Sequence, residues 1–162
     1  MAREDERRRL FSYLEKRFGI PETLFDDYLL FRRKRSWHLL RDVPQLATAS
    51  RLKVSKAGLR AFQEIGEFVK PTTRFIQIFG TAATRARLEI GKEQLQRLLE
   101  GQELPVDLGL GTGYVVLTLG GHQVLGLGFF IDGNVRSQIP RKELRQPMLR
   151  DLGVGVSKRT RA

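Results

Sequence analysis

The feature that most restricts the fold is a stretch over residues 108–130 without formal charge, LGLGTGYVVLTLGGHQVLGLGFF. A membrane-spanning helix needs about 20 mostly apolar residues, so the length alone allows one. However, Gly120-Gly121 interrupts the stretch, and such a pair between two β-rich runs is typical of a tight hairpin turn. The stretch therefore predicts two antiparallel strands, over 114–119 and 124–131, rather than a membrane span.

Glycines elsewhere in this stretch have the spacing that begins a dinucleotide-binding loop, at Gly109, Gly111 and Gly113. Such a loop lies between a strand and a helix, whose N-terminus faces the pyrophosphate. Here a predicted strand follows, so the glycines are interpreted as a loop that enters a sheet. Gly126 and Gly128 alternate with apolar residues, which indicates a bulge or a close backbone approach, as at the corner of a small barrel.

The first half of the chain, residues 1–78, is predicted to be a small α+β domain. An amphipathic helix over 4–18 begins it, because its apolar residues recur at helical spacing, and Gly19 ends that helix. Trp37 is interpreted as a core residue rather than as a stacking platform. Four short strands are expected after the helix, over 28–31, 37–40, 52–55 and 58–65.

The second half is predicted to be a β-barrel domain over 79–152, followed by a flexible basic tail over 153–162. A helix-start signal at Thr72 precedes the junction. A strand over 85–90 and a helix over 92–100 come next, and the glycine-rich hairpin follows them. The predicted fold class is therefore α+β, with a small N-terminal α+β domain and a C-terminal barrel.

The charge balance predicts a polyanionic partner. The chain has 29 Lys and Arg against 18 Asp and Glu, a net charge of +11, and such an excess attracts nucleic acid or an anionic surface. It has no cysteine, which excludes disulfides, zinc–thiolate sites and cysteine nucleophiles. Its two histidines, His38 and His122, have no further ligands spaced near them, so neither a metal nor another cofactor is expected. The N-terminus lacks the apolar segment of a signal peptide, so a cytoplasmic location is expected.

The order of motifs in the second half resembles the PUA domain, a small RNA-binding β-barrel. The strand TRARLEI leads to the helix KEQLQRLLEGQEL, and a glycine-flanked hairpin and VLGLGFF follow. Within that family, GLGFFIDGNVRSQIPRKELR is similar to the domain that ends Sun/Fmu-type RNA cytosine-5 methyltransferases. It is also similar to ribosome biogenesis factors of the Nip-seven type. The resemblance covers residues 84–145, and the first half resembles the preceding segment of these proteins more loosely.

The resemblance implies an RNA-binding function, and two departures bear on catalysis. Those methyltransferases carry a cofactor-binding domain and attack cytosine with cysteines, whereas this chain shows neither. Arg136 and Ser137 also stand where the methyltransferases carry a lysine–asparagine pair. The resemblance therefore implies a non-catalytic protein that binds ribosomal RNA or its precursor, beside ribosome-assembly or RNA-modification proteins and not at a membrane. Two alternatives remain, an RNA-recognition subunit of a modifying enzyme and a protein–protein adaptor.

Basic residues of the second half form the predicted RNA surface, because arginine binds phosphates bidentately and stacks on unpaired bases. The predicted set is Arg85, Arg87, Lys92, Arg136, Arg141, Lys142 and Arg145. A second basic run is either a phosphate-contacting loop or a soluble hairpin tip, at Arg32, Arg33, Lys34 and Arg35. A third run, Arg7 to Arg9, is interpreted as a solvated face because acidic neighbours nearly balance its charge.

Overall fold

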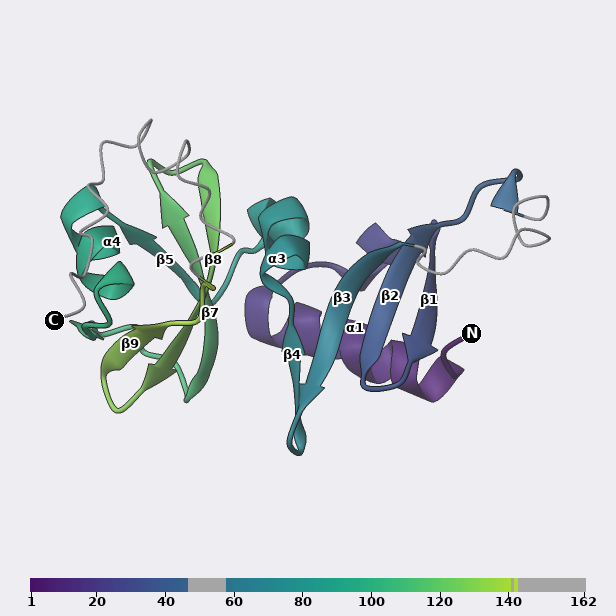
Figure 1. The fold of residues 1–162 in the computed structure, drawn as a ribbon, viewed down its shortest axis with the longest axis horizontal. Coiled ribbons are helices and arrows are strands. Elements are labelled where there is room, and N and C mark those ends of the chain that lie inside the picture. The colour runs from purple at the N-terminus through teal and green to yellow at the C-terminus, as the bar shows by residue number, and fades with distance from the viewer. Residues whose placement is uncertain (47–57, 141, 143–162) are drawn as a thin grey trace, which may run out of the picture. The chain divides into compact units, whose positions relative to one another are not determined.

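The computed structural model describes residues 1–46, 58–140 and 142. Contacts divide the chain into two compact units, Met1–Arg85 and Ala86–Ala162. Each unit has its own β-sheet and its own helical segments (Figure 1), so the protein is α+β, as the sequence predicts. The division falls between Arg85 and Ala86, seven residues after the predicted domain boundary at 78/79.

The first unit begins with α1 (Glu4–Phe18), at the residues where the sequence predicts a helix. Four antiparallel strands follow in sheet order, β1 (Tyr28–Arg33), β2 (Ser36–Arg41), β3 (Leu59–Ile65) and β4 (Phe68–Pro71). Figure 1 shows α1 running along one face of this sheet. The structure confirms three of the four strands predicted for this half, with small changes at their ends. The fourth, at 52–55, lies outside the described residues.

Aromatic side chains form the core of the first unit. The Phe11 ring of α1 stacks on that of Phe25, in the short 3-10 helix η1 (Glu22–Phe25), with centroids 4.6 Å apart. Phe62 of β3 lies 6.4 Å from Phe11, and Phe75 lies 5.3 Å from Phe62. Trp37 of β2 is fully buried, which confirms its interpretation as a core residue.

The last residues of the first unit form hydrogen bonds with the C-terminal end of α1. They follow α3 (Thr73–Phe79), which Thr72 caps by accepting a hydrogen bond from a backbone N–H, and the 3-10 turn η2 (Gly80–Ala82). The backbone N–H groups of Thr84 and Arg85 then both donate to the carbonyl of Phe18, each at 2.9 Å. These hydrogen bonds hold Thr84 and Arg85 in the first unit, which therefore ends later than the boundary predicted at 78/79.

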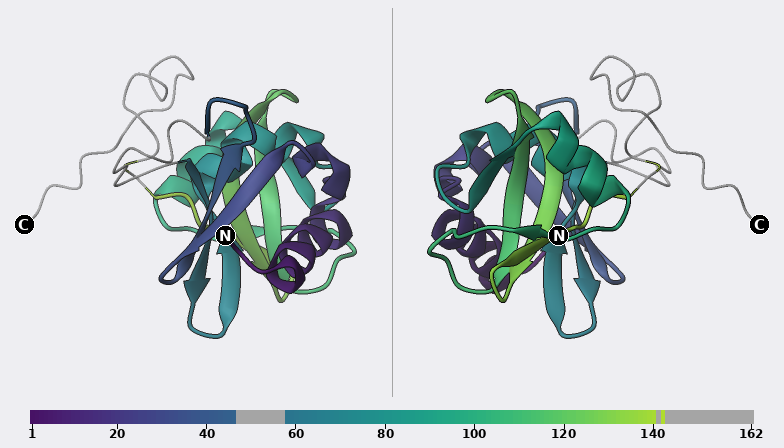
Figure 2. Two further views of the ribbon diagram at one scale, coloured as in Figure 1. Left: turned by 90° about the vertical axis from the view of Figure 1, so that its right-hand side faces the viewer. Right: turned by 90° about the vertical axis from the view of Figure 1, so that its left-hand side faces the viewer.

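The second unit is built on a five-stranded sheet with the order β5-β7-β8-β9-β6. Its strands are β5 (Arg87–Ile90), β6 (Leu104–Pro105), β7 (Gly113–Leu119), β8 (Gln123–Ile131) and β9 (Asn134–Ser137). The pair β5–β7 is parallel, and the other neighbours are antiparallel. Helix α4 (Lys92–Leu99) connects β5 to β6 and buries Leu95 and Leu98. Figures 1 and 2 show this sheet curling into part of a barrel.

Strands β7 and β8 form the hairpin predicted from the uncharged stretch. Gly120 and Gly121 lie in its turn with φ angles of 62° and 75°, which glycine adopts without the strain of a side chain. The uncharged stretch is therefore β-structure. Among the described residues, no helix is long and apolar enough to cross a bilayer.

The glycines of β8 mark a bulge and a close approach, as the sequence predicts. Leu117 pairs with Gly126 and Thr118 pairs with Val124, so the register shifts by one residue at Leu125. A side-chain Cβ placed on Gly128 would lie 2.6 Å from Cγ1 of Val135 in β9. A bulge bends its strand and increases the local twist, which agrees with the curled shape of this sheet.

Candidate nucleic-acid interface

The β1–β2 hairpin places two neighbouring arginines on opposite faces of the first sheet. Side chains alternate between the faces along a strand, so Arg32 shares a face with the buried Leu30, and Arg33 lies on the other face. Arg33 pairs with Ser36 in the ladder, and Lys34 occupies the turn with a φ of 52°. The basic run is therefore not a single surface, and its members have different surroundings.

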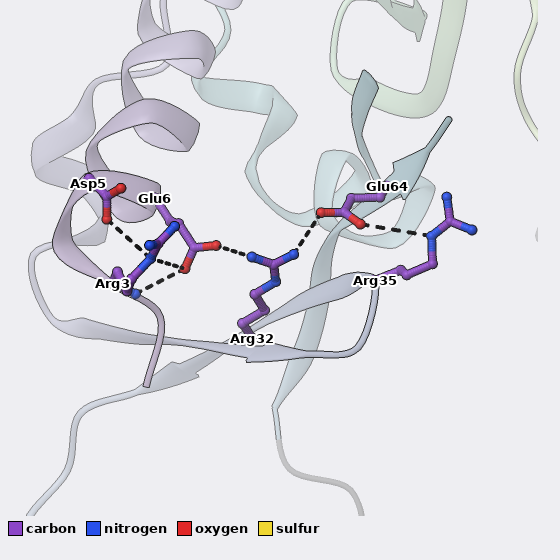
Figure 3. Close-up of polar contacts among 6 residues, drawn as sticks. All are labelled: Arg3, Asp5, Glu6, Arg32, Arg35 and Glu64. Atoms are coloured by element: carbon purple, nitrogen blue, oxygen red, sulfur yellow. Dashed lines mark hydrogen bonds and ion pairs between the residues drawn. The ribbon is translucent and has the colours of Figure 1, made fainter. Parts of the chain in front are cut away.

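Arg32 belongs to an ion-pair network that joins three elements of the first unit (Figure 3). Its guanidinium lies 2.5 Å from the carboxylate of Glu6 in α1 and 3.0 Å from that of Glu64 in β3. It also lies 5.2 Å from the centre of the Trp37 ring. The Glu6 side chain is only 6% exposed, and a buried carboxylate is costly unless it is paired. Arg32 therefore has a structural role.

The environment of Glu6 favours its ionised form. Its carboxylate accepts a hydrogen bond from the backbone N–H of Arg3 at 3.1 Å. This bond, with a further contribution from Arg32, lowers the pKa of Glu6, although burial acts in the opposite direction. The ionised carboxylate thus links the first turn of α1 to strand β1.

A pocket of about 660 Å³ lies beside the same hairpin. Its charged lining consists of four cationic side chains and one carboxylate, Arg33, Lys34, Arg35, Arg60 and Glu64. Its other lining residues are Ser36, His38, Gly58 and Gln63. The Glu64 carboxylate also pairs with Arg32 at 3.0 Å and with Arg35 at 3.8 Å. The lining is therefore strongly cationic.

A β-bulge brings Arg60 into this pocket. Trp37 pairs with Phe62 and His38 pairs with Arg60, so Ala61 is left over between them in β3. Without the bulge, the small Ala61 would lie opposite His38. Bulges often redirect side chains in this way beside functional sites.

His38 lies among the basic residues of the pocket. Its Nε2 lies 3.2 Å from the Ser36 hydroxyl oxygen. Burial, and then the positive charges of Arg60 and Arg33, lower the pKa of His38. Its imidazole is therefore neutral at pH 7, and it offers hydrogen-bonding nitrogens among fixed positive charges.

Ser36, His38 and Arg60 were not predicted to be members of one site. Alternation along the predicted strand at 37–40 indicates that Ser36 and His38 share a face. The position of Arg60, in contrast, depends on the bulge at Ala61, for which the sequence gives no signal. The complete set of pocket residues could therefore be identified only from the structure.

The interpretation of Arg7 as part of a solvated run is wrong. Its guanidinium donates to the carbonyls of Tyr28 at 2.8 Å and of Phe25 at 2.7 Å, and it lies 4.8 Å from the centre of the Phe11 ring. Residues four apart on a helix share a face, so the spacing that buries Phe11 carries Arg7 to the edge of the core. Arg8 is exposed, as expected.

The structure describes only part of the predicted RNA-binding set at the two ends of the second half. Arg141 and Arg145 lie outside the described residues, and Lys142 is described as exposed. Arg85 is exposed as well, but the contacts assign it to the first unit. Their shared role in RNA binding stays a prediction.

Arg87, Lys92 and Arg136 are exposed on three different elements of the second unit. Arg87 of β5 donates to the carbonyl of Gly121 at 3.0 Å, and Arg136 of β9 lies 2.5 Å from the carboxylate of Glu103. Lys92 is the first residue of α4, where a positive charge opposes the helix dipole. Strands β7 and β8 separate β5 from β9 in the sheet, so these cations are distributed around the unit.

Two aromatic residues and Arg136 lie side by side across three strands of the second sheet. Tyr114 of β7 pairs with Phe129 of β8, which pairs with Arg136 of β9. The two rings meet edge to face with centroids 5.2 Å apart, and both side chains are half-buried. Aromatic rings next to an arginine suit the stacking of unpaired bases. This row depends on the register between strands, so it was not predicted from the sequence.

Comparison with known proteins gives one informative match. No protein-family model matches the chain. Over 141 residues the chain is 28% identical to ribosomal RNA small subunit methyltransferase F from Psychromonas ingrahamii, an alignment that covers 84% of this chain. It covers 28% of the relative, so the chain spans less than a third of that protein's length. The match supports a relationship between this chain and the family of that methyltransferase.

Proposed function

We propose that this chain is a non-catalytic RNA-binding protein whose ligand is ribosomal RNA or its precursor. The observation that carries the proposal is the match to a small-subunit ribosomal RNA methyltransferase over 84% of the chain. The net charge of +11 supports it, since phosphate contacts dominate the affinity of proteins for nucleic acid. The PUA identity of the second unit, inferred from its motifs, belongs to the same proposal.

Two surfaces of the chain have chemistry suited to RNA. The pocket of the first unit combines four cationic side chains with uncharged hydrogen-bonding groups. The second unit offers the row of Tyr114, Phe129 and Arg136, together with exposed cations on β5 and α4. Arginine guanidinium groups bind phosphates bidentately, and aromatic rings stack on splayed-out bases.

The proposed absence of catalysis rests on the chemistry of methyl transfer to cytosine. The enzymes that the chain resembles attack the base with cysteine, and this sequence contains no cysteine. We expect no saturable binding of S-adenosylmethionine in isothermal titration calorimetry. Micromolar binding of that cofactor would contradict this part of the proposal.

A second candidate function is RNA recognition on behalf of a catalytic partner. The match favours it, because the relative is a methyltransferase and the aligned part is 28% of its length. In that case the chain would increase methylation of small-subunit ribosomal RNA when it is added to a partner enzyme. A protein–protein adaptor, in contrast, would bind the partner and not the RNA.

Fluorescence anisotropy with labelled fragments of small-subunit ribosomal RNA tests the proposed function. We expect saturable binding whose log–log salt dependence has a slope of about −0.7 for each single-stranded phosphate contacted. Duplex DNA of equal length serves as the control for simple charge attraction. Binding to the RNA that is absent, or no tighter than binding to the DNA, would contradict the proposal and favour the adaptor.

A further inference from the structure

We propose that the pocket beside the β1–β2 hairpin holds one nucleotide of single-stranded RNA, with its phosphate against Arg33 and Arg60. The inference rests on the proposed function and deepens it, because it assigns a ligand to a defined place in the first unit. Nothing in the motifs of the second half points to this pocket.

The charge of the lining selects an anion. Four cationic side chains and a single carboxylate, that of Glu64, line the pocket. That carboxylate is already in contact with the guanidinium groups of Arg32 and Arg35. Charge-assisted hydrogen bonds from arginine to phosphate are about twice as strong as neutral ones. A phosphate is therefore the anionic group that this lining suits.

The ladder places the two arginines on either side of His38. Arg60 is the direct partner of His38 across β2 and β3, and Arg33 is the direct partner of Ser36 across β1 and β2. Ser36 and His38 share a face by alternation, and the Ser36 hydroxyl lies 3.2 Å from the His38 ring nitrogen. Two guanidinium groups thus flank a neutral polar pair.

The effect of both arginines on His38 is consistent with this arrangement. After burial, the charge of Arg60 and then that of Arg33 lower the pKa of His38. The two cations therefore act on the same small volume. A bound phosphate would offset the positive charge that Arg33 and Arg60 exert on the His38 imidazole.

The size and lining of the site suit a single unpaired nucleotide. A volume of about 660 Å³ lies within the range of roughly 300–1,000 Å³ that is typical of small-ligand pockets. A duplex presents its phosphates on outward ridges and keeps its bases stacked, so it does not insert a base into a concave site. Single strands expose their bases and riboses, to which Ser36, His38 and Gln63 offer hydrogen bonds.

The test compares two double variants of the full chain that lose the same charge. Arg33→Gln with Arg60→Gln removes the two phosphate-binding groups of the pocket. Arg8→Gln with Arg74→Gln is the matched control, because both arginines are exposed, lie in the first unit and do not line the pocket. Circular dichroism melting checks that each variant is folded.

We expect the pocket variant to bind a short single-stranded RNA roughly tenfold or more weakly, since each charge-assisted hydrogen bond contributes more than a neutral one. Its salt slope should fall by about 0.7, the value for one phosphate. The affinity of the control variant for the single strand should stay within about twofold of that of the wild type. The affinity for the duplex, formed by annealing the same strand to its complement, should change equally in both variants.

Three outcomes would overturn the inference. In the first, both double variants lose affinity equally while the wild type binds RNA, so that net charge alone accounts for the effect. In the second, a free nucleoside monophosphate occupies the pocket as tightly as the RNA strand does. In the third, the pocket variant loses duplex binding as strongly as single-strand binding. If the wild type itself binds no RNA, the proposed function fails instead, which separates the two failures.

Discussion

The arginines of the β1–β2 hairpin and the cations of the second unit differ in how the backbone arranges them. In the hairpin, strand alternation separates Arg32 from Arg33, and a bulge in β3 adds Arg60 to the side of Arg33. In the second unit, Arg87 and Arg136 occupy strands that are not neighbours. Basic residues therefore form one cationic surface only where the backbone brings them together.

The interaction partners of these cations differ as well. Arg32 neutralises the buried carboxylate of Glu6, so it is part of the fold. Arg136 pairs with Glu103 at the surface, where the two side chains are 60% and 42% exposed. Exposed ion pairs contribute little to stability. Arg136 is therefore available to a ligand at small cost, whereas Arg32 is not.

The largest effect that we predict separates the two neighbouring arginines of the hairpin. Arg32→Gln removes the nearer of the two cations from the buried Glu6 carboxylate, leaving Arg3 at 3.9 Å. It should lower the free energy of unfolding by about 1.5–3 kcal/mol. Arg33→Gln, on the opposite face, should change it by about 0.5 kcal/mol or less. Urea denaturation measures both. Equal losses of stability would show that the two side chains do not have different structural roles.

The second prediction concerns the second unit and the close approach of β8 to β9. Gly128→Ala adds a Cβ that would lie 2.6 Å from the buried Val135 side chain, and overpacking of this kind costs roughly 1–3 kcal/mol. Gly101→Ala is a comparison with φ of 86° but no atom near the added carbon. Thermal unfolding should show that both variants are less stable than the wild type. Crowding against Val135 causes the loss of stability in Gly128→Ala, whereas backbone strain alone causes it in Gly101→Ala. Hydrogen exchange should locate the first loss in strands β8 and β9.

The third prediction gives the pH dependence of the contribution of Glu6. Its pKa in the folded protein lies below the ordinary value of 4.5, so its ionised form stabilises the fold fully above that value. This stabilisation declines as the pH falls through the lowered pKa. The difference in unfolding free energy between the wild type and Glu6→Gln should therefore be constant near neutral pH and shrink on acidification. A difference that grows as the pH falls would contradict the assigned network.

The smallest effect is expected for the dispersed cations of the second unit. Lys92→Gln with Arg136→Gln should lower the unfolding free energy by about 1 kcal/mol or less, because the Arg136–Glu103 pair is exposed. RNA affinity should fall modestly and to a similar extent for single strands and duplexes. A selective loss of single-strand binding would instead favour a defined site around Tyr114 and Phe129.

Much of the fold could be predicted from local patterns. The spacing of Leu10, Phe11 and Leu14 defines α1, and the Gly120-Gly121 pair defines the β7–β8 hairpin. These signals are local because helix periodicity and turn chemistry act over a few residues. The unit boundary was harder to locate, since it depends on backbone hydrogen bonds from Thr84 and Arg85 to Phe18.

The candidate site was less predictable because it depends on register. Arg33, Lys34 and Arg35 were identified as a basic run, but their separation from Arg32 requires the strand to be placed on its sheet. Arg60 joins them only through the bulge at Ala61. Periodicity does not reveal an extra residue in one strand of a pair, so this part of the site could not be derived from the sequence.

Phosphate binding in the pocket is tested most directly by nuclear magnetic resonance, which measures the pKa of His38 with and without saturating single-stranded RNA. The charged groups around His38 are Arg33 from β1, Arg60 and Glu64 from β3, and the turn residues Lys34 and Arg35. A phosphate bound among them should raise the pKa of His38, because its negative charge favours the protonated imidazole. Saturating RNA that leaves the pKa of His38 unchanged would contradict the account.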